Sequence, residues 1–290
     1  MSHIDIDREK CTACGLCVEV CPQDCFAQPT AEALPEMFQI EECIACGHCV
    51  AVCPADAVDH REFPSGSVRP VSKGILPGPE SLMEVFRARR SVREFKDEAV
   101  DGELIKNIIE AARLAPSAHN NQSTEYLVIT APGTMAKMAE LTVTFLAKTA
   151  KMLRHPVGRR IALLIGGSEV KGALTMLDDF NRVVEQAGLG RDRVLHNAPA
   201  VILFHGEKAA VYSHTNAQLA IQNAALMAAG LGLGAFYTGY VVAACTQERK
   251  IPDLVGIPKR HSVHGGLALG WPRLQYKKWP DKRPARVRWI

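Results

Sequence analysis

The sequence predicts a fold of two parts, in which a small cysteine-rich module precedes a larger body of mixed helices and strands. Three observations predict it: a cysteine-rich segment that repeats after 32 residues, a stretch of turn formers between Phe63 and Glu80, and alternating helical and strand-like apolar patterns beyond it. With 290 residues and 47% hydrophobic content, the chain can bury one large core beside a small module. We therefore expect domains over residues 1–63 and 80–290, joined by a linker over residues 64–79.

The N-terminal segment contains two C-x2-C-x2-C-x3-C-P runs. The 32-residue shift between them also superposes Gly15 on Gly47 and Asp24 on Asp56, so the segment is an internal duplication. This spacing is typical of iron-sulfur cubanes, for which a tight loop supplies three thiolates and a fourth comes from elsewhere. The sequence therefore predicts two 4Fe-4S clusters. Their expected ligands are Cys11, Cys14, Cys17, Cys21, Cys43, Cys46, Cys49 and Cys53.

In this two-cluster pattern, the cysteine before each proline ligates the cluster of the other run. The expected sets are Cys11, Cys14, Cys17 and Cys53 for one cluster, and Cys43, Cys46, Cys49 and Cys21 for the other. A pair of four-cysteine zinc sites is the alternative, but zinc ribbons place two C-x2-C pairs well apart in sequence. Cys25 and Cys245 lie outside the pattern and are expected to be ordinary buried or free thiols.

The net charge of +3 is unevenly divided along the chain. Residues 1–63 contain three basic and twelve acidic residues, a net charge of −9, which leaves +12 for residues 64–290. Opposite charges favour docking of the module on the body and steer electron-transfer partners, although acidic surfaces also serve solubility alone. No apolar segment is long enough to span a bilayer, and the clusters require a reducing compartment. We expect a soluble, cytoplasmic protein without a membrane partner.

The elements of the body follow from apolar periodicity and turn formers. We expect a first helix from Ser81 to about Arg90, with Ser81 and Glu84 forming a capping box, and a second helix from Asp101 to near Pro116. The remaining expected elements are a strand at 126–130, helices at 134–151 and 170–187, a strand at 200–204, a helix at 214–229 closed by Gly230, and strands at 235–237 and 263–269.

A basic run, Arg89-Arg90-Ser91-Val92-Arg93, follows the first helix. Alternate side chains of an extended segment point the same way, so Arg89, Ser91 and Arg93 can converge on a phosphate. Guanidinium suits this role because it donates in a bidentate fork and stays charged. A basic cluster is also commonly a solvated face, and the run alone does not decide between the two interpretations.

Two further segments combine polar groups and glycines. Residues 115–122 offer amide and hydroxyl donors that can hydrogen-bond the edge of a planar ring, or can simply end a helix in ordinary turns. Residues 230–240 contain three alternating glycines, but they follow a helix and open a strand, which is the wrong context for a dinucleotide fingerprint. Glycine there ends the helix and lets backbone approach a ligand.

Taken in order, these three segments closely resemble the nitroreductase family of FMN enzymes. The shared pattern is Arg-x-Ser-x-Arg-x-Phe after a first helix, Ala-Pro-Ser-Ala-His-Asn-x-Gln after a second, and a helix ending Gly-Leu-Gly-Leu-Gly. The resemblance covers about residues 80–290, while the N-terminal segment is similar to bacterial two-cluster ferredoxins. It implies an α+β fold, with a central sheet flanked by helices, in an intertwined homodimer that holds FMN at two interface sites.

The resemblance also implies the cofactor-binding residues. The FMN phosphate and ribityl chain would be held by Arg89, Ser91 and Arg93, and Arg90 of the same run is a further candidate. A basic residue of the C-terminal tail, Lys282 or Arg283, would also contact the phosphate. The flavin ring would be lined by Pro116, Ser117 and Asn120 from across the dimer, and by backbone of Thr238 and Gly239. A nucleic-acid arm is the alternative for the basic tail, but its aromatic residues are few and no nucleic-acid module accompanies it.

The resemblance implies an FMN-dependent, nitroreductase-like oxidoreductase that needs no catalytic side chain, because the flavin supplies the chemistry. The clusters would relay electrons to FMN, and FMN would pass them to a nitroaromatic, a quinone or an activated alkene. Alternatives are another flavin chemistry, such as reductive dehalogenation or flavin breakdown, and an electron-transfer adapter without its own substrate. Reduced ferredoxin and NAD(P)H are the candidate donors; we expect ferredoxin to be faster, because a flavin that takes hydride directly needs no cubanes. The sequence does not identify the electron acceptor, because residues 123–125 replace the Pro-Trp pair that is common in the family and residues 134–195 carry no cofactor motif.

Overall fold

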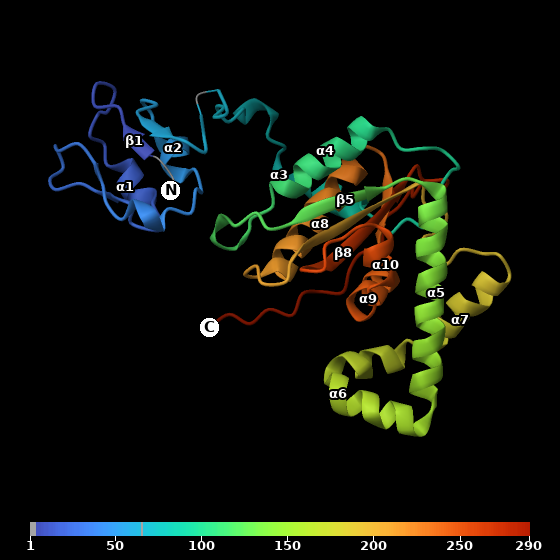
Figure 1. Cartoon of the computed structure of the whole chain (residues 1–290). Helices are drawn as coiled ribbons and strands as arrows, with labels where there is room; N and C mark the ends of the chain where they lie inside the picture. The colour runs from blue at the N-terminus through green and yellow to red at the C-terminus, as the bar shows by residue number, and fades with distance from the viewer. Residues whose placement is uncertain (1–3, 65) are drawn as a thin grey trace. The chain divides into compact units, whose positions relative to one another are not determined.

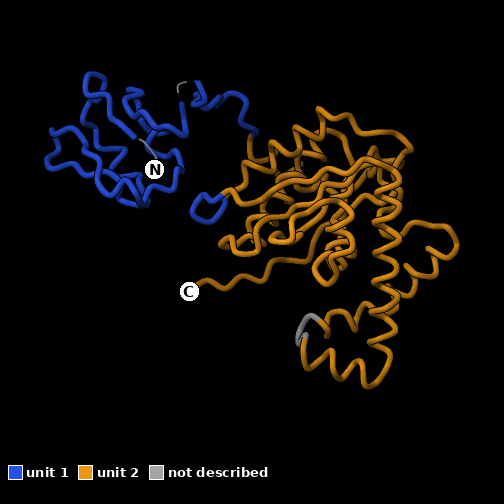
Figure 2. Tube along the Cα trace, in the orientation of Figure 1, with its two compact units in different colours: residues 1–77, 117–121 blue, residues 78–116, 122–290 orange. Residues whose placement is uncertain are grey.

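The protein is described by a computed structural model that covers residues 4–64 and 66–290, apart from the side chains of residues 166–169 (Figure 1). The chain forms two compact units (Figure 2). The N-terminal unit comprises Met1–Pro77 and Ser117–Asn121, and the body comprises Gly78–Pro116 and Gln122–Ile290. None of the helices in the described part of the chain is both long and apolar enough to cross a bilayer.

The N-terminal unit repeats its structure with the same 32-residue shift as its sequence. Helix α1 (Leu16–Val20) corresponds to α2 (His48–Val52). Strand β1 (Ile4–Ile6) pairs antiparallel with β4 (Val58–His60), and β2 (Phe26–Ala27) pairs antiparallel with β3 (Glu36–Met37). Each small sheet therefore takes one strand from each half, which ties the two halves together. The short 3-10 helices of the unit are η1 (Ile40–Glu42), η2 (Lys73–Ile75) and η3 (Ala118–Asn120).

The body is built on a four-stranded antiparallel sheet with the strand order β5-β6-β8-β7. The two central strands are buried on both faces, which explains the continuous apolar run at residues 200–204. The strands are β5 (Glu125–Ile129), β6 (Ala200–Glu207), β7 (Gly234–Tyr237) and β8 (His261–Gly270).

Helices cover both faces of this sheet. On one face, Ile108 of α4 and Ala224 of α8 pack with Phe204 of β6; on the other, helices α5 and α9 pack against Leu203. Figure 1 shows α5 extending beyond the sheet, with α6 at its far end. This arrangement confirms the α+β fold with a central sheet flanked by helices. The helices are α3 (Pro79–Ala88), α4 (Gly102–Arg113), α5 (Pro132–Arg154), α6 (Pro156–Thr175), α7 (Leu177–Gly188), α8 (Ser213–Gly230), α9 (Gly239–Gln247) and α10 (Lys250–Leu254).

The start of α4 follows its expected signal, whereas the start of α3 does not. The carboxylate of Asp101 accepts a hydrogen bond from the Glu103 amide at 2.7 Å, as an N-cap should. Helix α3 instead begins at Pro79, whose fixed φ suits the first helical position. The expected capping box of Ser81 and Glu84 is therefore wrong, because both residues lie inside the helix.

The middle of the body contains three helices where two were expected. The Pro156 ring cannot continue α5, so the chain breaks at His155 and starts α6. The first half of α6 was missed because its apolar residues do not mark one buried face, and Leu164 is 83% exposed. Gly230 was also wrongly expected to close α8. It belongs to the helix, and the left-handed residue after it is Gly232, with φ +77°.

Candidate cluster and cofactor sites

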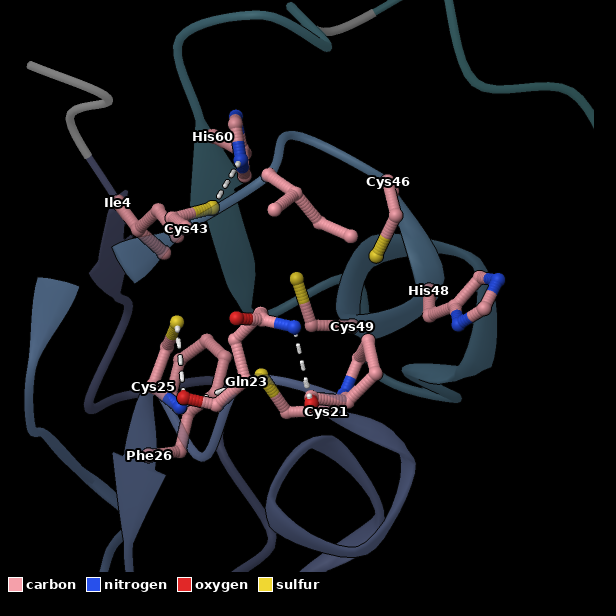
Figure 3. A pocket seen from close by; sticks show the side chains of 13 residues that line it. Ile4, Cys21, Gln23, Cys25, Phe26, Cys43, Cys46, His48, Cys49 and His60 are labelled. Atoms are coloured by element: carbon pink, nitrogen blue, oxygen red, sulfur yellow. Dashed lines mark hydrogen bonds between the residues drawn. The ribbon is translucent and has the colours of Figure 1, made fainter. Parts of the chain in front are cut away.

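Two cavities in the N-terminal unit are each lined by four of the predicted cysteine ligands. Each set combines three cysteines of one run with the Cys-Pro cysteine of the other. The first cavity is lined by Cys11, Cys14, Cys17 and Cys53, and the second by Cys43, Cys46, Cys49 and Cys21 (Figure 3). This grouping supports crossed ligation as the proposed coordination.

Backbone amides donate hydrogen bonds to several of these sulfurs. The Cys25 amide lies 3.3 Å from Cys21 Sγ, and the Ala57 amide lies 3.2 Å from Cys53 Sγ, at positions related by the duplication. The Ala45 amide donates to Cys43 Sγ at 3.4 Å. Donors of this kind stabilise thiolate ligands and tune the cluster that they hold. The cavities thus offer both the ligands and the outer hydrogen bonds that an iron-sulfur cluster uses.

Glycine is required where each cysteine loop turns into its helix. Gly15 and Gly47 precede α1 and α2 with φ of +73° and +76°, a left-handed conformation that other residues adopt at a cost. A Cβ on Gly47 would also lie 2.9 Å from the ring of Phe63. The loop that presents the first three cysteines of each run therefore depends on this glycine.

Burial raises the pKa of two of the cavity thiols in the absence of a metal. Desolvation raises the pKa of the Cys49 thiol to about 11 and also raises the pKa of Cys17. Both thiols are therefore protonated at neutral pH in the metal-free protein, and their protons leave when iron binds.

The two cysteines outside the runs lie in different places. Cys25 is buried and also lines the second cavity, where its thiol donates to the Gln23 carbonyl at 3.8 Å (Figure 3). Cys245 is buried in the core of the body. Burial raises the pKa of each thiol to about 12, so neither is a reactive thiolate at neutral pH.

The body contains an open cleft of about 1910 Å³, which reaches from α5, α6 and α7 to the end of β7. Among its described lining residues, the predicted cofactor ligands are Arg93, Thr238 and Gly239. The Arg93 guanidinium lies over the Phe236 ring at 5.5 Å from its centroid. Gly239 is the first residue of α9, where helix amides lack intrahelical partners. The cleft thus brings together a permanently charged guanidinium, an aromatic ring and the backbone amides at the start of α9.

Two polar atoms near strand β7 are buried without a hydrogen-bond partner among the described residues: Arg90 Nη2 and Thr238 Oγ1. Thr238 lines the cleft, whereas Arg90 is not among its described lining residues. Buried polar atoms are normally hydrogen-bonded, so these two atoms are available to a polar group of a bound ligand or water. Both flank β7: Ser91 bridges Ala235 of that strand, and Thr238 directly follows it. These residues fit the phosphate- and ring-bearing cofactor that the sequence resemblance implies.

Other predicted cofactor residues lie outside the described lining of the cleft. Arg89 and Ser91 follow the end of α3, and Pro116 is exposed after α4. Ser117 and Asn120 belong to the loop grouped with the N-terminal unit, where Asn120 Nδ2 donates to the Ala45 carbonyl at 2.6 Å. Lys282 and Arg283 are exposed in a C-terminal tail without helix or strand.

The cleft also contains residues that the sequence did not indicate. The ring of His196 packs edge-on against Phe236, with centroids 5.3 Å apart, and burial lowers the pKa of its imidazole. Helices α5 to α7, within a region that carries no cofactor motif, form a wall through side chains such as Phe145 and Asp179. Their role could be found only from the fold, because a helix that lines a cleft shows the same periodicity as one that lines a core.

Comparison with known proteins agrees with this geometry. The nitroreductase family model matches residues 86–271, more than half of the chain. The chain belongs to the nitroreductase family. A second family model, the 4Fe-4S dicluster domain, matches residues 3–54 of this nitroreductase-family protein. Both parts of the sequence resemblance are therefore confirmed, and the chain is an oxidoreductase with an iron-sulfur domain at its front.

Individual relatives are distant. A curated protein of Archaeoglobus fulgidus, "Putative NADH dehydrogenase/NAD(P)H nitroreductase", is 24% identical over 199 residues, which are 67% of this chain and 87% of the relative. A nitroreductase with bound FMN from Desulfitobacterium hafniense has a TM-score of 0.54 at 22% identity, covering 72% of this chain and 97% of its own. A nitroreductase with bound FMN from Bacteroides fragilis has a TM-score of 0.51 at 18% identity, covering 71% and 98%. These two structures establish the nitroreductase fold.

Proposed function

We propose that this nitroreductase-family protein is an iron-sulfur flavoprotein oxidoreductase, which passes electrons from two 4Fe-4S clusters to FMN and on to a small organic acceptor. The observation that carries the proposal is the sorting of eight cysteines into two crossed sets, in the same chain as a nitroreductase-family body. The proposed acceptors are a nitroaromatic, a quinone or an activated alkene. The FMN named in the two solved structures supports FMN as the flavin.

The N-terminal unit would hold the clusters through its eight cavity cysteines, and bound clusters carry electrons one at a time. The chain's own contribution is geometric and electrostatic. Each small sheet and each cysteine set takes parts from both halves, so loss of one half disturbs both sites. Amides such as that of Ala57 would stabilise the charge on the sulfur ligands.

The body would hold FMN along β7, and the bound flavin supplies the redox chemistry while the protein supplies placement. Arg93 and the unsatisfied Nη2 of Arg90 offer charged donors for the phosphate, while Thr238 would lie beside the flavin ring. Gly239 leaves backbone accessible at the start of α9. The further proposed FMN contacts are Arg89, Ser91, Pro116, Ser117, Asn120 and one of Lys282 and Arg283.

A homodimer is part of this proposal, because α6 presents apolar side chains that the single chain does not cover. Val157, Ile161, Leu164 and Ile165 are 60%, 52%, 83% and 83% exposed. Exposed apolar groups gathered on one element mark an interaction surface. Ile161 and Ile165 also line the cleft, so a second copy that covers α6 would close the cofactor site.

We expect anaerobically purified protein, supplied with reduced ferredoxin, to turn over at least one acceptor among nitroaromatics, quinones, activated alkenes and halogenated aromatics. The measurement is acceptor consumption by chromatography, with heat-treated protein as the control. Turnover confined to the halogenated compounds would favour reductive dehalogenation on the same fold. If no acceptor is consumed although the flavin is reduced, the protein is an electron-transfer adapter and the proposed reductase activity is wrong.

A further inference from the structure

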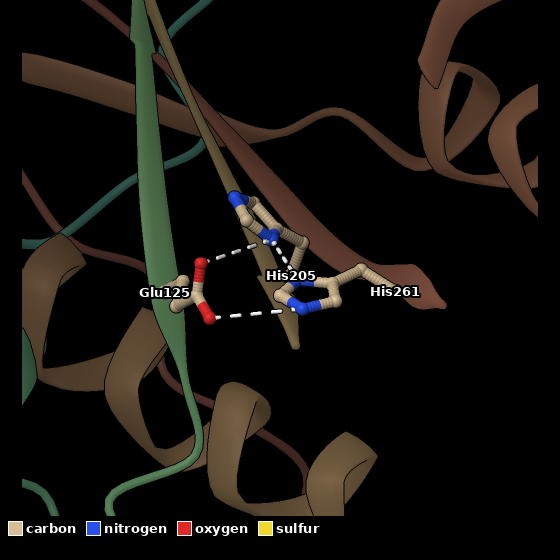
Figure 4. A group of neighbouring side chains, drawn as sticks. All are labelled: Glu125, His205 and His261. Atoms are coloured by element: carbon tan, nitrogen blue, oxygen red, sulfur yellow. Dashed lines mark hydrogen bonds and ion pairs between the residues drawn. The ribbon is translucent and has the colours of Figure 1, made fainter. Parts of the chain in front are cut away.

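Three side chains that could bind a metal ion converge at one end of the body sheet: Glu125 of β5, His205 of β6 and His261 of β8 (Figure 4). Glu125 lies directly opposite His205 in the pairing of β5 with β6. Side chains that face each other across an antiparallel pair project from the same face of the sheet. The strand register therefore places the carboxylate beside the first imidazole.

A β-bulge brings the third side chain to the same face. His205 pairs with Val263 of β8, and the register shift at this point leaves the next residue, His264, without a partner across the strand. Because side chains alternate along a strand, His261 projects from the same face as Val263 and hence as His205. Bulges of this kind re-aim side chains and are common beside functional sites.

The distances suit a single small ion. The Glu125 carboxylate oxygens lie 4.0 Å from His205 Nδ1 and 3.8 Å from His261 Nε2, and each imidazole would offer one nitrogen to an ion. One ligand atom from each residue falls within 4.8 Å of the other two. Two ligands that bind one tetrahedral zinc ion at about 2.0–2.1 Å lie about 3.4 Å apart. Small side-chain rotations therefore suffice to place all three around one ion.

Burial supplies an independent indication of a ligand. His261 is 2% exposed, and its Nε2 has no hydrogen-bond partner within the described part of the chain. The contact between the two histidines occupies only their Nδ1 atoms. Glu125 is exposed, so an ion can reach the group from solvent and meet a carboxylate there.

We propose that Glu125, His205 and His261 bind a divalent transition-metal ion that ties together three strands of the body. Two imidazoles and one carboxylate are the ligand set that zinc and iron(II) sites use, with positions left open for water. This site is separate from the cysteine cavities and does not depend on the proposed electron transfer.

The test uses zinc as the probe and anaerobic holoprotein, in which iron occupies the cysteine sites. We expect wild-type protein to bind about one zinc ion per chain in titration calorimetry, with nitrogen and oxygen ligands at about 2.0–2.1 Å in zinc-edge X-ray absorption. Glu125→Gln should weaken zinc binding roughly tenfold or more, and His261→Gln should abolish it, because each removes a ligand.

Two matched variants serve as controls. Glu103→Gln changes an exposed carboxylate of α4, on none of the three strands, and His264→Gln changes the other histidine near the bulge; both should bind zinc as the wild type does. The proposal is overturned if wild-type protein binds no zinc, or if Glu125→Gln binds it as tightly as Glu103→Gln. It is equally overturned if the absorption spectrum shows only sulfur ligands at about 2.3 Å, because the zinc would then occupy cysteines.

Discussion

Replacing Cys53 with alanine should remove the cluster of the first cysteine run, although Cys53 belongs to the second run. The reason is that Cys53 lines the cavity of Cys11, Cys14 and Cys17. Each cubane holds four irons, so the iron content of anaerobically purified protein should fall from about eight to about four per chain. Iron analysis and electron paramagnetic resonance of the reduced protein measure the loss.

Two reference variants identify which cluster is lost. Cys14→Ala removes a ligand from the first cavity, and Cys46→Ala removes one from the second. With crossed ligation, the spectrum of Cys53→Ala matches that of Cys14→Ala. Cys25→Ser is the control. The Cys25 thiol donates a hydrogen bond to the Gln23 carbonyl and is not an expected cluster ligand, so this variant should retain both clusters. A Cys53→Ala spectrum that matches Cys46→Ala, or loss of a cluster in Cys25→Ser, would show that the ligand assignment is wrong.

Replacing Arg93 with alanine should release FMN while both clusters remain. A charge-assisted hydrogen bond contributes roughly 1.5–3 kcal/mol, so the FMN dissociation constant should rise roughly tenfold to a hundredfold or more. Arg93→Lys keeps the charge but loses the bidentate fork, and its affinity should be intermediate. Fluorescence titration of the flavin-free protein with FMN measures these constants.

The matched control for Arg93 is Arg87→Ala. Arg87 also lies over an aromatic ring, that of Trp279 at 4.5 Å, but it is not among the described residues that line the cleft. Its removal should leave FMN affinity within about a factor of two, as expected for a surface change. Equal FMN affinity in Arg93→Ala and the wild type would contradict the proposed phosphate contact.

Local patterns predicted most of the fold. Cysteine spacing follows from the ligands that one cluster needs, and the positive φ at Gly15 and Gly47 shows that the backbone repeats as the sequence does. The central strands β6 and β8 were indicated by apolar runs, because strands buried on both faces need them. Helix α6 was partly missed, since exposed Leu164 and Ile165 do not define a buried stripe.

Sites assembled from distant parts of the chain were harder to predict. Arg93, Thr238 and Gly239 share the cleft, but more than a hundred residues separate the first from the other two, and only resemblance to a family linked them. Glu125, His205 and His261 gave no sequence signal, because strand register and a one-residue bulge bring them together. Register depends on the packing of the whole sheet, which no short pattern encodes.

The central claim is that electrons reach the flavin through the clusters, and anaerobic stopped-flow measurement of flavin reduction tests it most directly. For wild-type protein, reduced ferredoxin should bleach the flavin faster than NADH or NADPH. In the full-length Cys14→Ala/Cys46→Ala variant, which should lack both clusters, ferredoxin-driven reduction should disappear while dithionite still reduces the flavin. Ferredoxin reduction of this variant at the wild-type rate, or faster reduction of the wild type by NAD(P)H, would contradict the account.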